Sequence, residues 1–127
     1  MSSRKEARRT ALTLLYQWDL TRQPLASLFE GEIDPFATEL ATAVIERAEA
    51  LDELITEASS DWPADRLGVV ERAALRMAIV ELDQHQVPRE VAINEAVALS
   101  KRFASQEAAR LVNGILGRII QDLPSTR

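Results

Sequence analysis

The chain has 127 residues, about the size of one domain, and 46% of them are hydrophobic while 28% are charged, a composition typical of folded soluble proteins. It has no cysteine, a single histidine and no run of about 18 apolar residues, which excludes disulfides, cysteine zinc sites and a membrane-spanning helix. We therefore expect a cytoplasmic protein that holds no metal and no cofactor.

The spacing of apolar residues predicts five helices separated by short breaks. The expected ranges are 3–20, 35–59, 67–84, 88–103 and 106–123, with one further helical turn near 25–29. Ser3 and Glu6 have the spacing of a capping box, and Asp34-Pro35 is a typical helix start. The segment Asp61-Trp62-Pro63 should end the second helix, and Pro124 should end the last.

These elements predict an all-α fold, a compact helical bundle. The segment 67–84 is apolar nearly all round, as helices at the centre of a bundle are. Asn113-Gly114 would signal a hairpin turn between alternating strands, but its flanks repeat every 3.6 residues. We therefore expect this pair to lie within the last helix.

Charge is distributed unevenly along the chain, whose net charge is −5. Residues 1–22 carry five Lys and Arg against two Asp and Glu, whereas residues 23–65 carry one Arg against eleven acids. Residues 88–127 are again mildly basic, with six cations and four acids. A local basic surface binds phosphate even on an acidic protein, although the acidic segment is equally consistent with a solvated helix face.

Motifs for catalysis are absent from the sequence. It has no phosphate-binding loop, no dinucleotide fingerprint and no nucleophile elbow. His85 stands alone near a helix end, and Asp52, Glu53 and Glu57 lie on an acidic amphipathic helix, where solvated carboxylates are far more common than catalytic ones. We therefore expect a protein that is not an enzyme.

Four cations in the first two turns of the first helix, Arg4, Lys5, Arg8 and Arg9, are the most informative feature. Cations at this end oppose the helix dipole, and a local rule broken without local gain often marks function. A phosphate group would benefit from the charge and from the free N–H groups together. The alternative is a basic end that serves solubility alone.

A second group of polar residues spans the turn between the last two helices and contains Lys101, Glu107 and Arg110. Cations near a helix C-terminus are common and stabilising, so this group indicates binding only if it lies beside the first helix. Tyr16 could offer its ring to a base, although a tyrosine at such a position is more often half core and half surface.

Four segments of the sequence resemble motifs of the NusB family, in the family's order and over nearly the whole chain. They are RRTALTLLYQW at 8–18, RAALRMAIVEL at 72–82, VPREVAINEAV at 87–97 and LVNGIL at 111–116. The last two signatures are the more specific. Leu111 stands where the family usually has an aromatic residue, so stacking by that side chain is lost.

The resemblance implies one domain of two helical subdomains, about 1–60 and 61–127. It also implies binding of boxA RNA together with small-subunit ribosomal protein ten (NusE), in an antitermination complex with RNA polymerase over ribosomal RNA operons. The RNA-binding residues that it implies are Arg4, Lys5, Arg8, Tyr16, Lys101, Glu107 and Arg110, and it points to Arg76 and Glu81 for the protein partner. An acid such as Glu107 would accept hydrogen bonds from a base.

Two other functions remain open at this point. One is a helical interaction module without an RNA role, because some proteins of this fold form homodimers. The other is the NusB-like domain that precedes the catalytic domain of some RNA methyltransferases. A chain of 127 residues leaves no room for a methyl-donor site, which makes a free-standing enzyme improbable.

Overall fold

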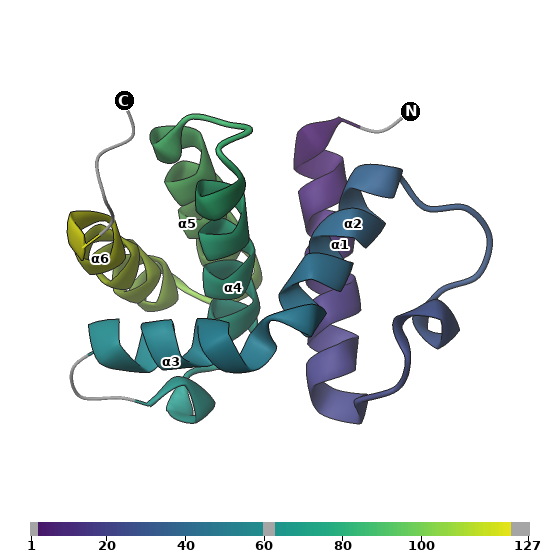
Figure 1. The fold of residues 1–127 in the computed structure, drawn as a ribbon, viewed down its shortest axis with the longest axis horizontal. Helices are drawn as coiled ribbons and strands as arrows, with labels where there is room; N and C mark the ends of the chain where they lie inside the picture. The colour runs from purple at the N-terminus through teal and green to yellow at the C-terminus, as the bar shows by residue number, and fades with distance from the viewer. Residues whose placement is uncertain (1–2, 60–62, 123–127) are drawn as a thin grey trace.

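The computed structural model describes residues 3–59 and 63–122, which form six α-helices, two short 3-10 helices and no strand (Figure 1). This confirms the predicted all-α fold. The elements are α1 (Arg4–Thr21), η1 (Leu25–Leu28), α2 (Pro35–Glu46), α3 (Ala48–Ala58), η2 (Ala64–Arg66), α4 (Val69–Gln84), α5 (Arg89–Phe103) and α6 (Gln106–Asp122).

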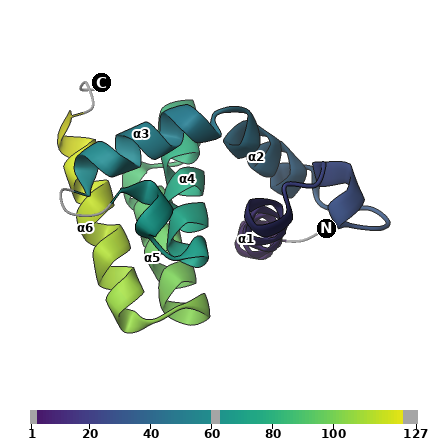
Figure 2. The same ribbon diagram turned by 90° about the horizontal axis from the view of Figure 1, so that it is seen from below.

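The helices form two groups with α4 between them. Figures 1 and 2 show α1 and α2 side by side at one end of the molecule and α3, α5 and α6 gathered around α4 at the other. Helix α4 contacts every other α-helix, and its residues 73–82 are all buried. The prediction of a central, buried helix in this part of the chain is confirmed.

One hydrophobic core runs through both groups of helices. Helix α1 contributes leucines at 12, 14 and 15 to this core, and α2 adds Leu40 and Val44. The opposite side is filled by aliphatic residues of α3 and α6, namely Leu51, Ile55, Val112, Ile115, Leu116 and Ile119. Because apolar side chains from nearly every element meet here, the N-terminal helices are fixed relative to the rest of the molecule.

The single helix predicted over 35–59 is wrong, because the chain bends at Arg47, where φ is −111° and ψ is 12°. Helix α2 packs on α1, whereas α3 turns away to pack on α4 and α6. Leu40, Val44, Leu51 and Ile55 keep helical spacing across the bend, so periodicity could not reveal it. The chain thus passes from one helix group to the other at Arg47.

Helices α1 and α4 both end at a residue in the left-handed conformation, Arg22 with φ 56° and His85 with φ 57°. His85 is therefore a helix cap, one of the ordinary positions expected for a lone histidine.

Asn113 and Gly114 lie within α6, as predicted. The breaks expected at Asp61-Trp62 and at Pro124 lie outside the described residues. None of the helices in the described part of the chain is long and apolar enough to cross a membrane.

Candidate nucleic-acid interface

The start of α1 is held by the predicted capping box. The Ser3 hydroxyl accepts a hydrogen bond from the Glu6 N–H at 3.1 Å, and the Glu6 carboxylate accepts one from the Ser3 N–H at 3.1 Å. These bonds satisfy N–H groups that have no acceptor within the helix itself. The first turn is thereby fixed, and with it the points from which Arg4 and Lys5 project.

Arg4 and Lys5 are both exposed, and each is held by a different helix. The Arg4 guanidinium carbon lies 4.1 Å from the centroid of the Phe36 ring, which belongs to the first turn of α2. The Lys5 ammonium lies 3.0 Å from a carboxylate oxygen of Glu95 on α5, yet its side chain remains 71% exposed. Two of the predicted RNA-binding cations are therefore at the surface.

Arg8, which is predicted to contact RNA, lies in the interior of the fold. Its guanidinium is paired with Glu81 of α4, with Nη2 2.7 Å from Oε1 and Nε 2.9 Å from Oε2. The two side chains are only 4% and 6% exposed. Hydrogen bonding to Glu81 raises the pKa of Arg8 and prevails over burial, which acts in the opposite direction. Glu81, predicted to contact a partner protein, is likewise occupied inside the fold.

Arg76, the other residue predicted to contact a partner, is also buried. Its Nε and Nη2 each lie 2.8 Å from the carboxylate of Asp52 on α3, and its Nη1 lies 3.7 Å from Asp19 of α1. Asp19 in turn accepts a hydrogen bond from Arg72 Nε at 2.9 Å. Arg76 is 1% exposed and ties three helices together.

Tyr16 lies on the same side of α1 as Lys5 and Arg9, because these positions are four and seven residues apart. It is 42% exposed, so its ring is accessible. Arg9 is half-buried and makes no ion pair with the described residues. It is a cation that the predicted site set omitted, although its spacing from Lys5 could have indicated it.

Lys101, Glu107 and Arg110 are all exposed around the turn between α5 and α6. Ser105 caps α6, since its hydroxyl accepts the Ala108 N–H at 2.9 Å. No contact is seen between this group and Arg4 or Lys5 in the described residues. The Lys5–Glu95 ion pair is the contact that joins the start of α1 to α5, the helix that carries Lys101. Arg102 follows Glu95 by two helical turns, about 10 Å along the same side of α5, and is a further cation that the predicted set omitted.

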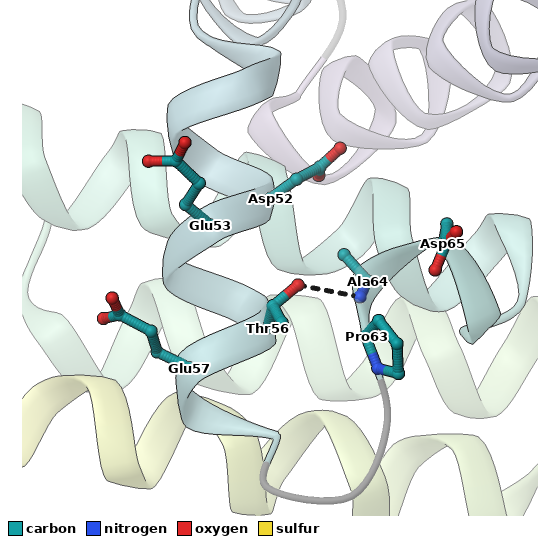
Figure 3. Close-up of a pocket in the computed structure, with 7 residues that line it drawn as sticks. All are labelled: Asp52, Glu53, Thr56, Glu57, Pro63, Ala64 and Asp65. Carbon is teal, nitrogen blue, oxygen red and sulfur yellow. Dashed lines mark hydrogen bonds between the residues drawn. The ribbon is translucent and has the colours of Figure 1, made fainter.

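A cavity of about 430 Å³ between α3 and η2 is acidic and does not suit RNA (Figure 3). Asp52, Glu53, Glu57 and Asp65 contribute to its lining, and the Thr56 hydroxyl accepts the Ala64 N–H at 2.9 Å across it. Glu53 and Glu57 are exposed, in agreement with solvated carboxylates. In the part of the chain that the structure describes, no group of histidine, cysteine and acidic side chains could hold a metal ion.

The fold and its surface define a class: a small all-helical protein that presents cations at a capped helix start. The sequence model of the NusB family matches residues 5–121. The chain is 42% identical to the transcription antitermination protein NusB of Exiguobacterium sp., over 94% of this chain and 98% of that protein. It is 37% identical to the Bacillus pumilus protein of the same name, over 94% and 96%.

Solved structures agree. The fold is similar to that in the crystal structure of antitermination factors NusB and NusE in complex with dsRNA, with a TM-score of 0.84, 30% identity and coverage of 94% of this chain and 97% of that chain. It is also similar to the solution structure of NusB from Aquifex aeolicus, with a TM-score of 0.78, 31% identity and coverage of 100% and 97%. This chain belongs to the NusB family of transcription antitermination proteins.

Proposed function

We propose that this chain is a non-catalytic antitermination factor that binds boxA-type single-stranded RNA in ribosomal RNA operon transcripts, together with NusE and within an RNA polymerase complex. The observation that carries the proposal is the exposed pair Arg4 and Lys5 on a capped helix start, in a chain of net charge −5. The interaction of each cation with the positive end of the helix dipole costs roughly 0.3–1 kcal/mol, and a bound phosphate offsets this cost.

In the proposed complex, four exposed cations contact phosphates: Arg4, Lys5, Lys101 and Arg110. Tyr16 offers its exposed ring to an unstacked base, the usual way in which proteins read single-stranded RNA. Glu107 repels phosphate but accepts hydrogen bonds from base amino groups, which gives it a part in sequence selection. Arg8 contributes by holding α1 against α4 instead of binding RNA itself.

The similar structure that contains NusB, NusE and dsRNA supports the pairing of RNA with a NusE partner. Arg76 and Glu81 lie beneath the surface of α4 and would support a partner's binding surface instead of touching it. The more specific part of the proposal is that the RNA is single-stranded boxA RNA, and this part rests on exposed Tyr16 beside the cations.

A second candidate is a helical module that forms homodimers without RNA. It is favoured by two exposed apolar side chains, Leu20 at 60% and Phe103 at 47% exposure. Scattered apolar residues are ordinary on the surfaces of monomers, so this observation is the weaker of the two.

The test is fluorescence anisotropy with three labelled RNAs, a boxA single strand, a scrambled single strand and a duplex, with and without NusE. Four phosphate contacts on a single strand predict a slope of about −2.8 for log affinity against log salt, or about 50-fold weaker binding between roughly 50 and 200 mM. Arg66→Ala, which removes an exposed cation on η2, is the matched control for Arg4→Ala.

Stronger binding of the boxA strand in the presence of NusE, reduced by Arg4→Ala and not by Arg66→Ala, would support the proposal. Equal binding of all three RNAs would overturn the boxA specificity. An absence of RNA binding in both conditions, with dimers seen by analytical ultracentrifugation, would favour the second candidate.

A further inference from the structure

The Phe36 ring lies beside two guanidinium groups from α1. The Arg4 carbon is 4.1 Å from its centroid and the Arg8 carbon is 5.5 Å away. Both distances are within the range of cation–π attraction, which draws a cation to the face of an aromatic ring. Phe36 thus joins the first turn of α2 to the first two turns of α1.

The ring itself is firmly placed. Asp34 caps α2 by accepting the Phe36 N–H at 2.9 Å, and Pro35 occupies the first helical position. Phe36 is half-buried and packs against the hydrophobic core. Arg8, on the same ring, is immobilised by Glu81. Of the three side chains that meet at the ring, Arg8 is buried, Phe36 is half-buried and Arg4 is exposed.

An aromatic ring and a carboxylate have different effects on a cation that must later bind phosphate. Glu95 orders Lys5 but also balances its charge. Phe36 is neutral, so it orders the Arg4 guanidinium and leaves the whole positive charge available. A ring covers one face of the planar guanidinium, while the second face and the N–H edge can still receive a ligand.

We infer that Phe36 is a positioning residue for RNA binding, which holds Arg4 in the orientation that a nucleotide requires. This inference rests on the proposed function and extends its site from α1 onto the start of α2. A long arginine side chain loses rotamer freedom when it binds, and a side chain that is already ordered loses less. The ring therefore increases RNA affinity without touching the RNA.

The experiment compares Phe36→Leu, Phe36→Tyr, Arg4→Ala and the double variant Arg4→Ala/Phe36→Leu, all checked for folding by circular dichroism. We expect Phe36→Leu to weaken boxA RNA binding about 5-fold, the order of magnitude for ordering one long side chain, and Phe36→Tyr to stay within about 2-fold. In the Arg4→Ala background, Phe36→Leu should add no further loss. The single variant Phe36→Leu should show the same dependence of log affinity on log salt as the unmodified protein, because no charge is removed. Arg4→Ala should reduce that slope by about 0.7.

A second measurement does not depend on RNA. The side-chain protons of Arg4 should show an upfield ring-current shift by NMR in the free protein, and the shift should vanish in Phe36→Leu. Absence of this shift in the unmodified protein would overturn the inference, as would an equal loss from Phe36→Leu with and without Arg4. RNA binding that Phe36→Leu leaves intact would overturn the inference while the proposed function stands. No RNA binding by the unmodified protein, with the shift present, would overturn both.

Discussion

Arginines lie in different surroundings at the start of α1 and in the buried cluster around Asp19 near its end. At its start, Arg4 is exposed and rests on an aromatic ring. At its end, the Asp19 side chain is 3% exposed and lies among arginines, with Arg72 bonded to it and Arg76 at 3.7 Å. The difference follows the partner of each guanidinium. Arg8 and Arg76, which pair with carboxylates of another helix, are buried. Arg4 and Arg22, each 4.1 Å from the centroid of an aromatic ring, are exposed.

This difference also separates stability from binding. A buried ion pair stabilises a fold little compared with an apolar pair of similar shape, but loss of one partner leaves an uncompensated charge. An exposed cation contributes little to folding, yet it interacts strongly with a polyanion at low salt. Exposed Arg4 and buried Arg76 should therefore respond to substitution in different assays.

The largest effect should come from Arg76→Ala, which leaves the buried Asp19 with one arginine fewer and Asp52 without its hydrogen-bonded partner. We expect a loss of about 3–5 kcal/mol in the free energy of unfolding, measured by urea denaturation, because removal of this buried side chain also leaves a cavity in the core. Arg66→Ala, at an exposed position, should change it by less than about 0.5 kcal/mol. Similar losses for both variants would contradict the assignment of Arg76 to the interior.

The next effect concerns the pair Arg8–Glu81. Arg8→Ala should cost about 3 kcal/mol of unfolding free energy, because Glu81 is left buried and charged. The double variant Arg8→Met/Glu81→Leu should recover most of this loss, since both charges are replaced by apolar side chains of similar length. RNA affinity of the folded double variant should stay within about 2-fold of the unmodified protein. A drop of 10-fold or more would return Arg8 to the RNA-binding set.

The course of the helices could be predicted from local pattern. The capping box at Ser3, the proline start at Pro35 and the all-round apolar run of the central helix each depend on residues close in sequence, and each is found in the structure. The bend at Arg47 could not be predicted, because it has no proline or glycine and the apolar spacing continues through it. It arises from packing against two different neighbours.

The site was predictable only in part, for the same reason. Lys5 and Tyr16 are exposed as their helical positions predict. Arg8 lies at the edge of the apolar stripe, and its burial depends on Glu81, which is 73 residues further along the chain. Phe36 reads as an ordinary core residue of its own helix until α1 is placed beside it. Contacts between distant segments leave no periodic signal.

A smaller effect tests whether the two basic groups form one surface. The double variant Lys101→Ala/Arg110→Ala should weaken RNA binding on the order of 20-fold and reduce the salt slope by about 1.4, without loss of stability. Both residues are exposed, so folding does not depend on them. If the variant binds RNA with the affinity and slope of the unmodified protein, the α5–α6 turn lies outside the interface.

The smallest predicted effect is a gain. Glu95 lies 3.0 Å from the Lys5 ammonium and competes with a phosphate for it. Glu95→Gln removes this competitor, so RNA affinity at low salt should rise about 3-fold, with a slope steeper by up to about 0.7. Glu90→Gln is the matched control, since it removes the same charge from an exposed position on α5.

In the Lys5→Ala background the gain from Glu95→Gln should vanish. An equal gain from both glutamines would show that only net charge matters, and a gain that persists without Lys5 would show that Glu95 repels the RNA directly.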